Sequence, residues 1–194
     1  MGMDINGLDP QITGIEPKWP KDYDKLSQKA KETFWELRDE FHSNNPGVYF
    51  RANIWSWRPI HMICMAINDM YSLGFDMDAW GFNSGGGLKT QEECTKLANS
   101  LEEWVKIYDA KDVERIGFNL GSWTVENIDG NGYNLDNGLE PKDLKELNSA
   151  YPHIVEEVPI KFKGRTLYPS HHTGLEHIQE FITFLNSCGG FEIW

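Results

Sequence analysis

Side chains able to bind a ligand are densest in the stretch YFRANIWSWRP, residues 49–59. Side chains alternate along a strand, so every second residue here should point to the same face. That face would carry Tyr49, Arg51, Asn53 and Trp55, continued by Trp57 and Arg58 at the start of a helix. Aromatic rings stack on flat rings, a guanidinium pairs with phosphate or carboxylate, and an amide hydrogen-bonds a ring edge. The cluster predicts a site for a flat anionic molecule such as a nucleotide derivative; alternatively, the tryptophans are core residues and the arginines pair with acids.

A glycine-rich loop, FNSGGGL at residues 82–88, is the second candidate. Consecutive glycines leave backbone N–H groups accessible, and such groups can form an anion-binding nest in front of a helix. A Walker A loop needs Lys-Ser/Thr directly after its last glycine, and here Lys89 and Thr90 come one residue late. The alternative to a nest is a flexible connection. The residues expected to cap the anion are Asn83, Ser84, Gly85, Gly86 and Gly87.

Two other patterns suggest metals but do not fit known sites. The stretch SHHTGLEH places His171, His172, Glu176 and His177 close together, yet its spacing matches no HExxH motif. The stretch DGNGYNLDNGLE resembles a calcium loop but has Asn134 where glycine is required. We expect capping residues in the first and Asx-rich turns in the second, and therefore neither a metal nor another cofactor. No serine lies in a nucleophile-elbow motif, so the sequence predicts no nucleophilic catalysis.

The helices and strands that would position these residues follow from hydrophobic spacing and capping signals. A helix from Asp22 should end at the SNNPG turn, and a strand over VYFRANIWSW, residues 48–57, should lead to a helix that begins at Pro59 and ends at Gly74. Thr90 and Glu93 form a capping box for a helix to about Tyr108. Its buried face would consist of Cys94, Leu97, Ala98, Leu101, Val105 and Tyr108.

The C-terminal half predicts fewer elements. Pro141 should begin a short helix, and two short strands should flank Lys163 and Gly164. Thr173 and Glu176 form a second capping box for a last helix, which glycines end before a terminal FEIW strand. The apolar face of that helix would carry Leu175, Ile178, Ile182 and Leu185. The whole predicts one α+β domain over residues 21–194, with about four main helices around short antiparallel strands, preceded by an extended arm over residues 1–20.

Composition excludes several classes of protein. The 194 residues carry 18 basic and 30 acidic side chains, a formal charge of −12, which would repel a DNA or RNA polymer. No run of about 18 apolar residues predicts a membrane span, and no export signal is apparent. The three cysteines are far apart in apolar patterns, as in reduced cytoplasmic proteins. We therefore expect a cytoplasmic protein with no membrane partner, and association with further copies of the chain is left open.

The segments GVYFRANIWSWRPI and EHIQEFITFLNSCGGFEIW resemble blocks of an uncharacterised family of small phage and bacterial proteins. In that family a YFRxNxWxWRP-like block opens the fold, a glycine-containing loop follows, and a helix ending in SGGFEI closes the chain. The resemblance covers about a third of this sequence, in three blocks. Many members carry a CxxC zinc knuckle, which this chain lacks, so no zinc-dependent role is expected. The resemblance implies a phage or prophage setting and, if phage-encoded, the cytoplasm of the host cell.

Phage proteins of this size include sponges that sequester immune signalling nucleotides, and that anti-defence role is our leading hypothesis for function. It agrees with a cluster suited to a planar anion and with the lack of catalytic motifs. One alternative is a hydrolase or lyase acting on such a nucleotide, with His61 or His171 as the acid–base group. Another is an acidic interaction protein that inhibits a host protein.

Overall fold

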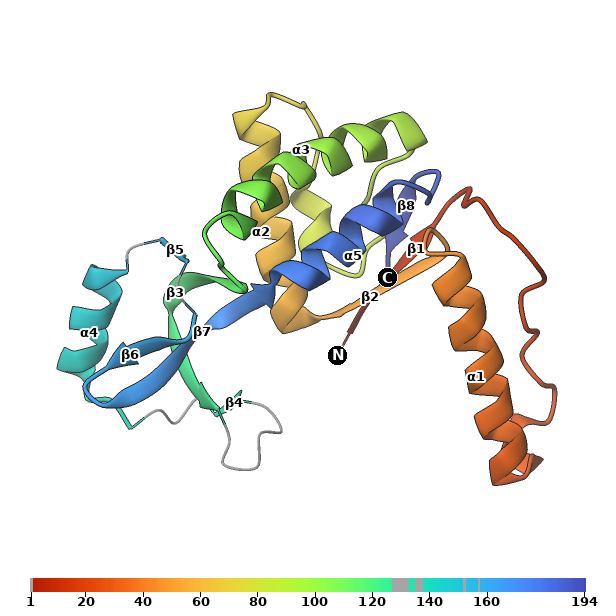
Figure 1. The fold of residues 1–194 in the computed structure, drawn as a ribbon, viewed down its shortest axis with the longest axis horizontal. Helices are drawn as coiled ribbons and strands as arrows, with labels where there is room; N and C mark the ends of the chain where they lie inside the picture. The colour runs from red at the N-terminus through yellow and green to blue at the C-terminus, as the bar shows by residue number, and fades with distance from the viewer. Residues whose placement is uncertain (1, 127–132, 135–137, 152, 157) are drawn as a thin grey trace.

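The fold is α+β, as the sequence predicts, and is seen in a computed structural model (Figure 1). The structure describes residues 2–126, 133–134, 138–151, 153–156 and 158–194. These described residues form five α-helices and two antiparallel sheets. One sheet has the strand order β2-β1-β8, and the other has the order β4-β3-β7-β6 with β5 paired to β3.

The first sheet contains the N-terminus of the chain. β1 (Gly2–Gly7) is its middle strand, between β2 (Tyr49–Asn53) and β8 (Phe191–Ile193). The expected N-terminal arm is therefore corrected at its start, because Met3 and Ile5 are buried and only the following residues run extended beside a helix. The strand is too short to show periodicity, and the partners that stabilise it are distant in sequence.

β2 confirms the predicted alternation, since Phe50 and Ala52 are buried, but it ends sooner than predicted. Helix α2 (Ile54–Met70) begins directly after Asn53, whereas the sequence predicted a start at Pro59. The Asn53 side-chain oxygen accepts hydrogen bonds from the backbone N–H groups of Trp55 and Ser56, both at 2.9 Å. This N-cap satisfies donors that a new helix leaves unpaired, so the chain turns helical at once.

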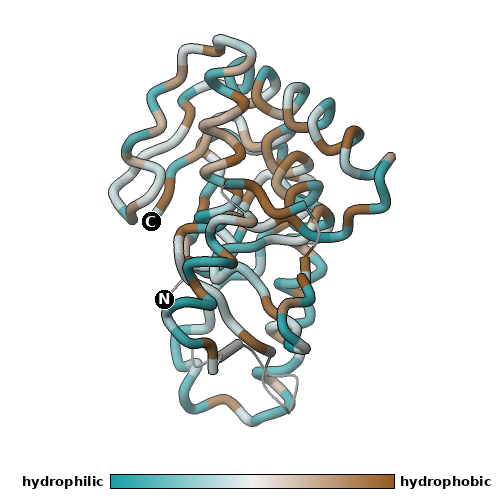
Figure 2. The backbone as a smooth tube through the Cα atoms, turned by 90° about the vertical axis from the view of Figure 1, so that its left-hand side faces the viewer, coloured by the Kyte–Doolittle hydropathy of each residue, from teal (hydrophilic) through white to brown (hydrophobic). Residues whose placement is uncertain are grey.

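The main core lies between α2, α3 (Gln91–Asp109), α5 (Leu175–Leu185) and the first sheet. The capping box of Thr90 and Glu93 is present, and the six residues predicted for the buried face of α3 are all buried. The predicted face of α5 is buried as well. Figure 2 shows hydrophobic and hydrophilic residues alternating along the coiled parts of the backbone, as expected for helices with one packed face.

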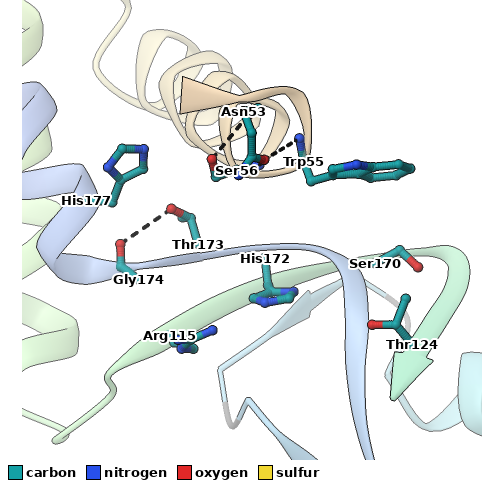
Figure 3. Close-up of a pocket in the computed structure, with 10 residues that line it drawn as sticks. All are labelled: Asn53, Trp55, Ser56, Arg115, Thr124, Ser170, His172, Thr173, Gly174 and His177. Atoms are coloured by element: carbon teal, nitrogen blue, oxygen red, sulfur yellow. Dashed lines mark hydrogen bonds between the residues drawn. The ribbon is translucent and has the colours of Figure 1, made fainter. Parts of the chain in front are cut away.

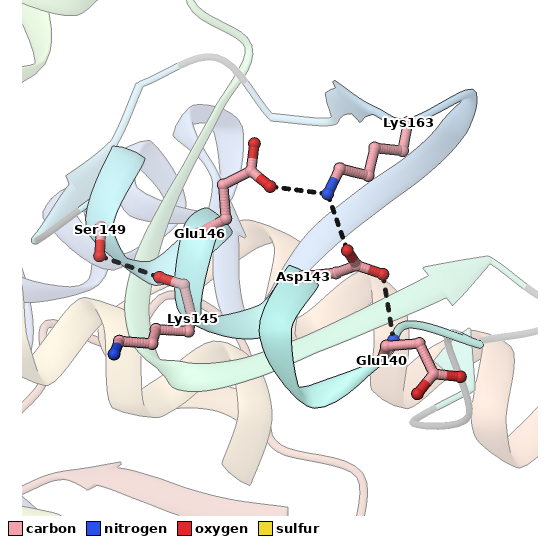
Figure 4. A network of polar contacts seen from close by, with 6 residues as sticks. All are labelled: Glu140, Asp143, Lys145, Glu146, Ser149 and Lys163. Carbon is pink, nitrogen blue, oxygen red and sulfur yellow. Dashed lines mark hydrogen bonds and ion pairs between the residues drawn. The ribbon is translucent and has the colours of Figure 1, made fainter.

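The second sheet carries a smaller core with α4 (Pro141–Ala150), which begins at proline as predicted. Its strands are β3 (Arg115–Glu126), β4 (Tyr133–Asn134), β5 (Ile154–Val155), β6 (Ile160–Phe162) and β7 (Arg165–Gly174). Lys163 and Gly164 form the predicted turn, with φ of 47° and 77°. Lys163 also pairs with Asp143 and Glu146 of α4, at 2.7 and 2.6 Å (Figure 4), which ties the turn to the helix.

The capping box predicted at Thr173 and Glu176 is wrong. β7 continues to Gly174, which is the N-cap of α5 and has no side-chain capping bond. Thr173 is held in the strand because it pairs with Ile116 of β3, and Gly174 pairs with Arg115. The histidines of the SHHTGLEH stretch therefore lie on a strand up to His172, and only His177 lies on the helix. The DGNGYNLDNGLE stretch lies largely outside the described residues.

Helix α1 (Gln28–Asn44) extends away from the rest of the fold, with residues 8–22 running beside it (Figure 1). It begins later than the predicted Asp22, because Ser27 accepts a hydrogen bond from the backbone N–H of Ala30, 3.3 Å away, and caps it there. The sequence predicted a helix packed along one apolar face. Phe34 and Phe41 are buried, but Leu37 of that face is exposed.

Candidate functional site

A cavity of about 670 Å³ opens between the start of α2, the β3–β7 pair and the start of α5 (Figure 3). The sharp strand-to-helix junctions at Asn53 and at Gly174 bring both helix starts to its wall. Ligand cavities in proteins have volumes of about this size. The described residues that line it are Asn53, Trp55, Ser56, Arg115, Thr124, Ser170, His172, Thr173, Gly174 and His177.

The cavity differs in charge from the rest of the protein. Its described lining includes one arginine and two histidines and contains no aspartate or glutamate. Four side-chain hydroxyls also line it: those of Ser56, Thr124 and Thr173 donate to backbone carbonyls, that of Ser170 bonds to Ser122, and each would have to rotate to donate to a ligand. In a chain with a formal charge of −12, such a wall favours an anion with several hydrogen-bonding oxygens.

His172 lies on β7 with its ring orientation defined by the backbone. Its Nδ1 lies 2.8 Å from the carbonyl oxygen of Pro169, and because a carbonyl only accepts, Nδ1 carries the proton. The lone pair of the neutral ring is therefore on Nε2. Burial and the nearby Arg115 lower the pKa of His172 below 6.5, so its ring is neutral at pH 7.

His177 lies in the first turn of α5 and is oriented by a carboxylate. Its Nδ1 donates to Oε2 of Glu180, 2.8 Å away, and its ring stacks on Phe50 with centroids 5.0 Å apart. The Glu180 contact places the proton of the neutral ring on Nδ1 and orients the ring. This carboxylate–imidazole pair is a common support for proton transfer.

Trp55 forms the aromatic part of the wall, and about half of its surface is exposed. Its ring lies 5.4 Å from that of His171, at 53°. His171 is almost fully buried, and its Nε2 accepts from Nη1 of Arg58, 3.1 Å away. Burial, Arg58 and His172, in that order, lower the pKa of His171, so this ring is neutral too. Arg58 contacts His171, and His171 in turn contacts Trp55, but neither Arg58 nor His171 is in the described lining of the cavity.

Two residues of the predicted binding face, Tyr49 and Arg51, interact with the neighbouring strand β1 instead. The Tyr49 hydroxyl donates to the Asp4 carboxylate, and Arg51 Nε lies 3.9 Å from the same oxygen. Burial and then Asp4 raise the pKa of Tyr49 to about 12. Both side chains thus interact with an acidic residue of β1, and neither lines the cavity.

Trp57 lies in the main core instead of the predicted site. It is fully buried, and its Nε1 donates to the carbonyl oxygen of Trp80, 2.7 Å away. The reason is the early start of α2: residues two apart face opposite sides of a helix, whereas residues three apart share a side. Trp55 and Arg58 therefore lie together on the outside, and Trp57 points inward.

The glycine loop, residues 83–87, packs against the C-terminal strand. The Gly85 N–H donates to the carbonyl of Ile193, and the Ile193 N–H donates to that of Gly86, both at 2.9 Å. Gly87 has φ of +151°, and a Cβ there would lie 2.0 Å from the Phe191 carbonyl oxygen. Close approach to β8 explains these glycines, and none of the residues 83–87 is in the described lining of the cavity.

Sequence reasoning missed most of the cavity wall. For the stretch that contains His172 and His177 the sequence predicts capping residues and places neither histidine in a binding site. Within the described residues, no group of three acidic, histidine or cysteine side chains is placed to hold a metal. No local motif contains Arg115, Thr124 and Ser170. They come together only because β3 pairs with β7. His61, the other predicted acid–base candidate, lies elsewhere, with its Nε2 3.0 Å from the Met77 carbonyl.

No protein-family model matches this chain, and no curated protein or solved structure is significantly similar to it. Among the described residues, no helix has both the length and the apolarity needed to cross a membrane. The function of the cavity must therefore be inferred from its own chemistry.

Proposed function

We propose that the cavity binds a small anionic ligand with a flat ring, of the nucleotide class, and that the protein sequesters it. The observation that carries the proposal is the charge of the wall: Arg115 and two imidazoles, with no carboxylate among its described residues, in a strongly acidic protein. Sequestration requires tight ground-state binding and no preference for a transition state. In the phage setting implied by the sequence resemblance, the ligand is an immune signalling nucleotide.

Each part of the wall has a role in this proposal. Trp55 stacks on the base, as exposed tryptophans do with flat rings. Arg115 pairs with phosphate, supported by the positive end of α5, whose N-cap Gly174 provides no side-chain acceptor. The four hydroxyls hydrogen-bond the sugar or the base edge.

A thermal-shift screen with mono-, di- and cyclic nucleotides tests this proposal. A ligand at a hundred times its dissociation constant should add about 2.7 kcal/mol of apparent stability. The variant Arg115→Gln should bind the same nucleotide at least tenfold more weakly, since it loses a charge-assisted contact. If no nucleotide stabilises the wild type, or if Arg115→Gln binds equally well, the proposal fails.

A second candidate is hydrolysis of a phosphodiester in the same cavity, favoured by the His177–Glu180 pair beside His172. The neutral His172 ring would take a proton from water as its oxygen bonds to phosphorus. The P–O bond to the leaving group would then break, and protonated His177 would give its proton to the departing oxygen. His61 and His171, the catalysts considered from sequence, do not line the cavity.

Chromatography of the nucleotide after incubation and denaturation separates the two candidates. Recovery of the intact molecule supports sequestration, and new products support hydrolysis. Under hydrolysis, His177→Gln should abolish product formation while binding persists. Under sequestration, that variant should change affinity only.

A further inference from the structure

The α1 arm, residues 8–45, is a second surface with unusual properties. It extends from the body of the molecule (Figure 1) and exposes large apolar side chains on both of its segments. Ile15 is 89% exposed and Trp19 is 54% exposed, while Leu37 on the facing helix is 51% exposed. A groove of about 500 Å³ runs between the two segments, lined in part by Ile15, Pro17 and Leu37. Contiguous exposed apolar surface of this kind marks an interaction site.

The arm is held in shape by its own contacts. Asn45 is buried, and its side chain accepts from the Thr13 N–H and donates to the carbonyls of Thr13 and Phe41. Near the far end, the Trp19 ring lies 5.1 Å from Phe34 and 5.7 Å from Trp35. Binding to such a surface would require less ordering than binding to a loose segment.

The far end of the arm, residues 18–31, is basic. It contains five lysines and two aspartates, a charge of +3, so the rest of the chain carries −15. Lys18, Lys21 and Lys29 are exposed, and among the described residues none of them has an ion-pair partner within 4 Å. A basic, aromatic end on a strongly acidic protein is complementary to the remainder of that same protein.

A groove of about 480 Å³ offers the matching surface, where α3 ends, β3 begins and α5 begins. Its described lining includes four carboxylates, from Asp109, Asp112, Glu114 and Glu176, and one cationic side chain, Arg115, which also lines the candidate cavity. The groove belongs to the body of the fold, and α1 extends away from that body (Figure 1). The basic end of the arm therefore lies away from the acidic groove of its own copy.

We infer that the basic end of the α1 arm docks in the acidic groove of a second copy of this chain. The arm and the groove are different surfaces, so the contact is head-to-tail, and a dimer as a whole still presents one free arm and one free groove. An anionic membrane or a nucleic acid would also attract the lysines, but the −15 charge of the remaining chain would repel both. A second copy is acidic as well, so its overall charge opposes the contact, and the short-range pairing of the lysines with the four carboxylates of the groove must exceed that repulsion.

Sedimentation velocity with two charge-reversal variants tests the inference. The arm variant is Lys18→Glu/Lys21→Glu/Lys29→Glu, and the groove variant is Asp109→Lys/Glu114→Lys. Wild type should associate in low salt and dissociate as salt is raised, because the contact is between exposed charges. Each variant alone should remain monomeric. An equimolar mixture of the two variants should associate again, because the intact basic arm of one meets the intact acidic groove of the other, and their two reversed surfaces are also opposite in charge.

The variant Lys142→Glu/Lys145→Glu/Lys161→Glu is the matched control, because it makes the same charge change on exposed lysines elsewhere. It should associate much more than the arm variant does. Thermal melts of all variants check that each remains folded. A wild type that stays monomeric at low salt overturns the inference, and so does association that persists in the groove variant. Binding of the wild type, but not the arm variant, to phosphatidylserine vesicles without self-association would identify a membrane as the occupant and equally overturn it.

Discussion

Arg58 donates a hydrogen bond from Nη1 to Nε2 of His171, 3.1 Å away, and so joins the second turn of α2 to β7. The contact lies behind Trp55, whose ring is 5.4 Å from that of His171. It requires a neutral imidazole, because a protonated ring has no lone pair to accept with. The position of the aromatic wall of the cavity is therefore linked to the protonation of a buried histidine.

Stability should fall as the pH is lowered from 7.5 to 5.5. The pKa values of His42, His61, His171 and His172 are all lowered in the folded state, chiefly by burial. The unfolded chain, with histidine pKa near 6.5, then binds more protons than the folded one, so stability is complete above about pH 6.5 and is lost below it. Urea unfolding at several pH values measures this. His171→Asn should reduce the slope, and a stability that rises toward pH 5.5 would refute the prediction.

Trp55→Ala and Trp57→Ala should have different effects, the first on ligand binding and the second on stability, although the residues are only two positions apart. Trp57 is fully buried, so its truncation should cost about 3–5 kcal/mol of unfolding free energy. Trp55 is half exposed at the cavity, so its loss should weaken nucleotide binding more than tenfold and change the melting temperature little. Calorimetry and urea unfolding of both variants test the pair. Equal destabilisation by the two substitutions would show that Trp55 is a structural residue.

Three substitutions at Asn53 should separate helix capping from ligand binding. Asn53→Ala removes the acceptor for Trp55 and Ser56 and should cost about 1 kcal/mol. Asn53→Ser keeps a neutral cap and should preserve both stability and affinity. Asn53→Asp also keeps the cap, but it introduces a carboxylate into the cavity wall, so stability should persist while anion binding falls. Unchanged binding in Asn53→Asp would argue against an anionic ligand near this residue.

Gly87→Ala should destabilise the protein more than Gly74→Ala. Both glycines have positive φ, of +151° and +77°, so an alanine at either position is strained by about 1–2 kcal/mol. At Gly74 a new Cβ would meet no atom within 4 Å, whereas at Gly87 it would lie 2.0 Å from the Phe191 carbonyl oxygen. That clash should add about 1–3 kcal/mol. Urea unfolding measures both variants, and equal losses would contradict the role assigned here to the glycine loop.

Local sequence signals predicted the helices and several strands well. The Thr90 capping box, the buried face of α3 and the turn at Lys163–Gly164 depend on residues that are near one another in the chain. Two local predictions, the start of α2 at Pro59 and the capping box at Thr173, were wrong because another interaction fixes the backbone there. Asn53 caps α2 before Pro59 can begin it, and pairing with β3 keeps Thr173 in a strand.

The amino-acid order alone determined the α+β class, the acidic charge and the periodic faces of α3 and α5, because propensity, capping and hydrophobic spacing act over a few residues. Tertiary structure decided the cavity. Its wall joins Trp55 to Arg115 and His172, which are distant in the sequence, through the packing of α2 against the β3–β7 pair. Trp57 points inward because residues 54–58 are helical and not part of a strand. Contacts between residues so far apart depend on how whole elements pack, which no local pattern of side chains specifies.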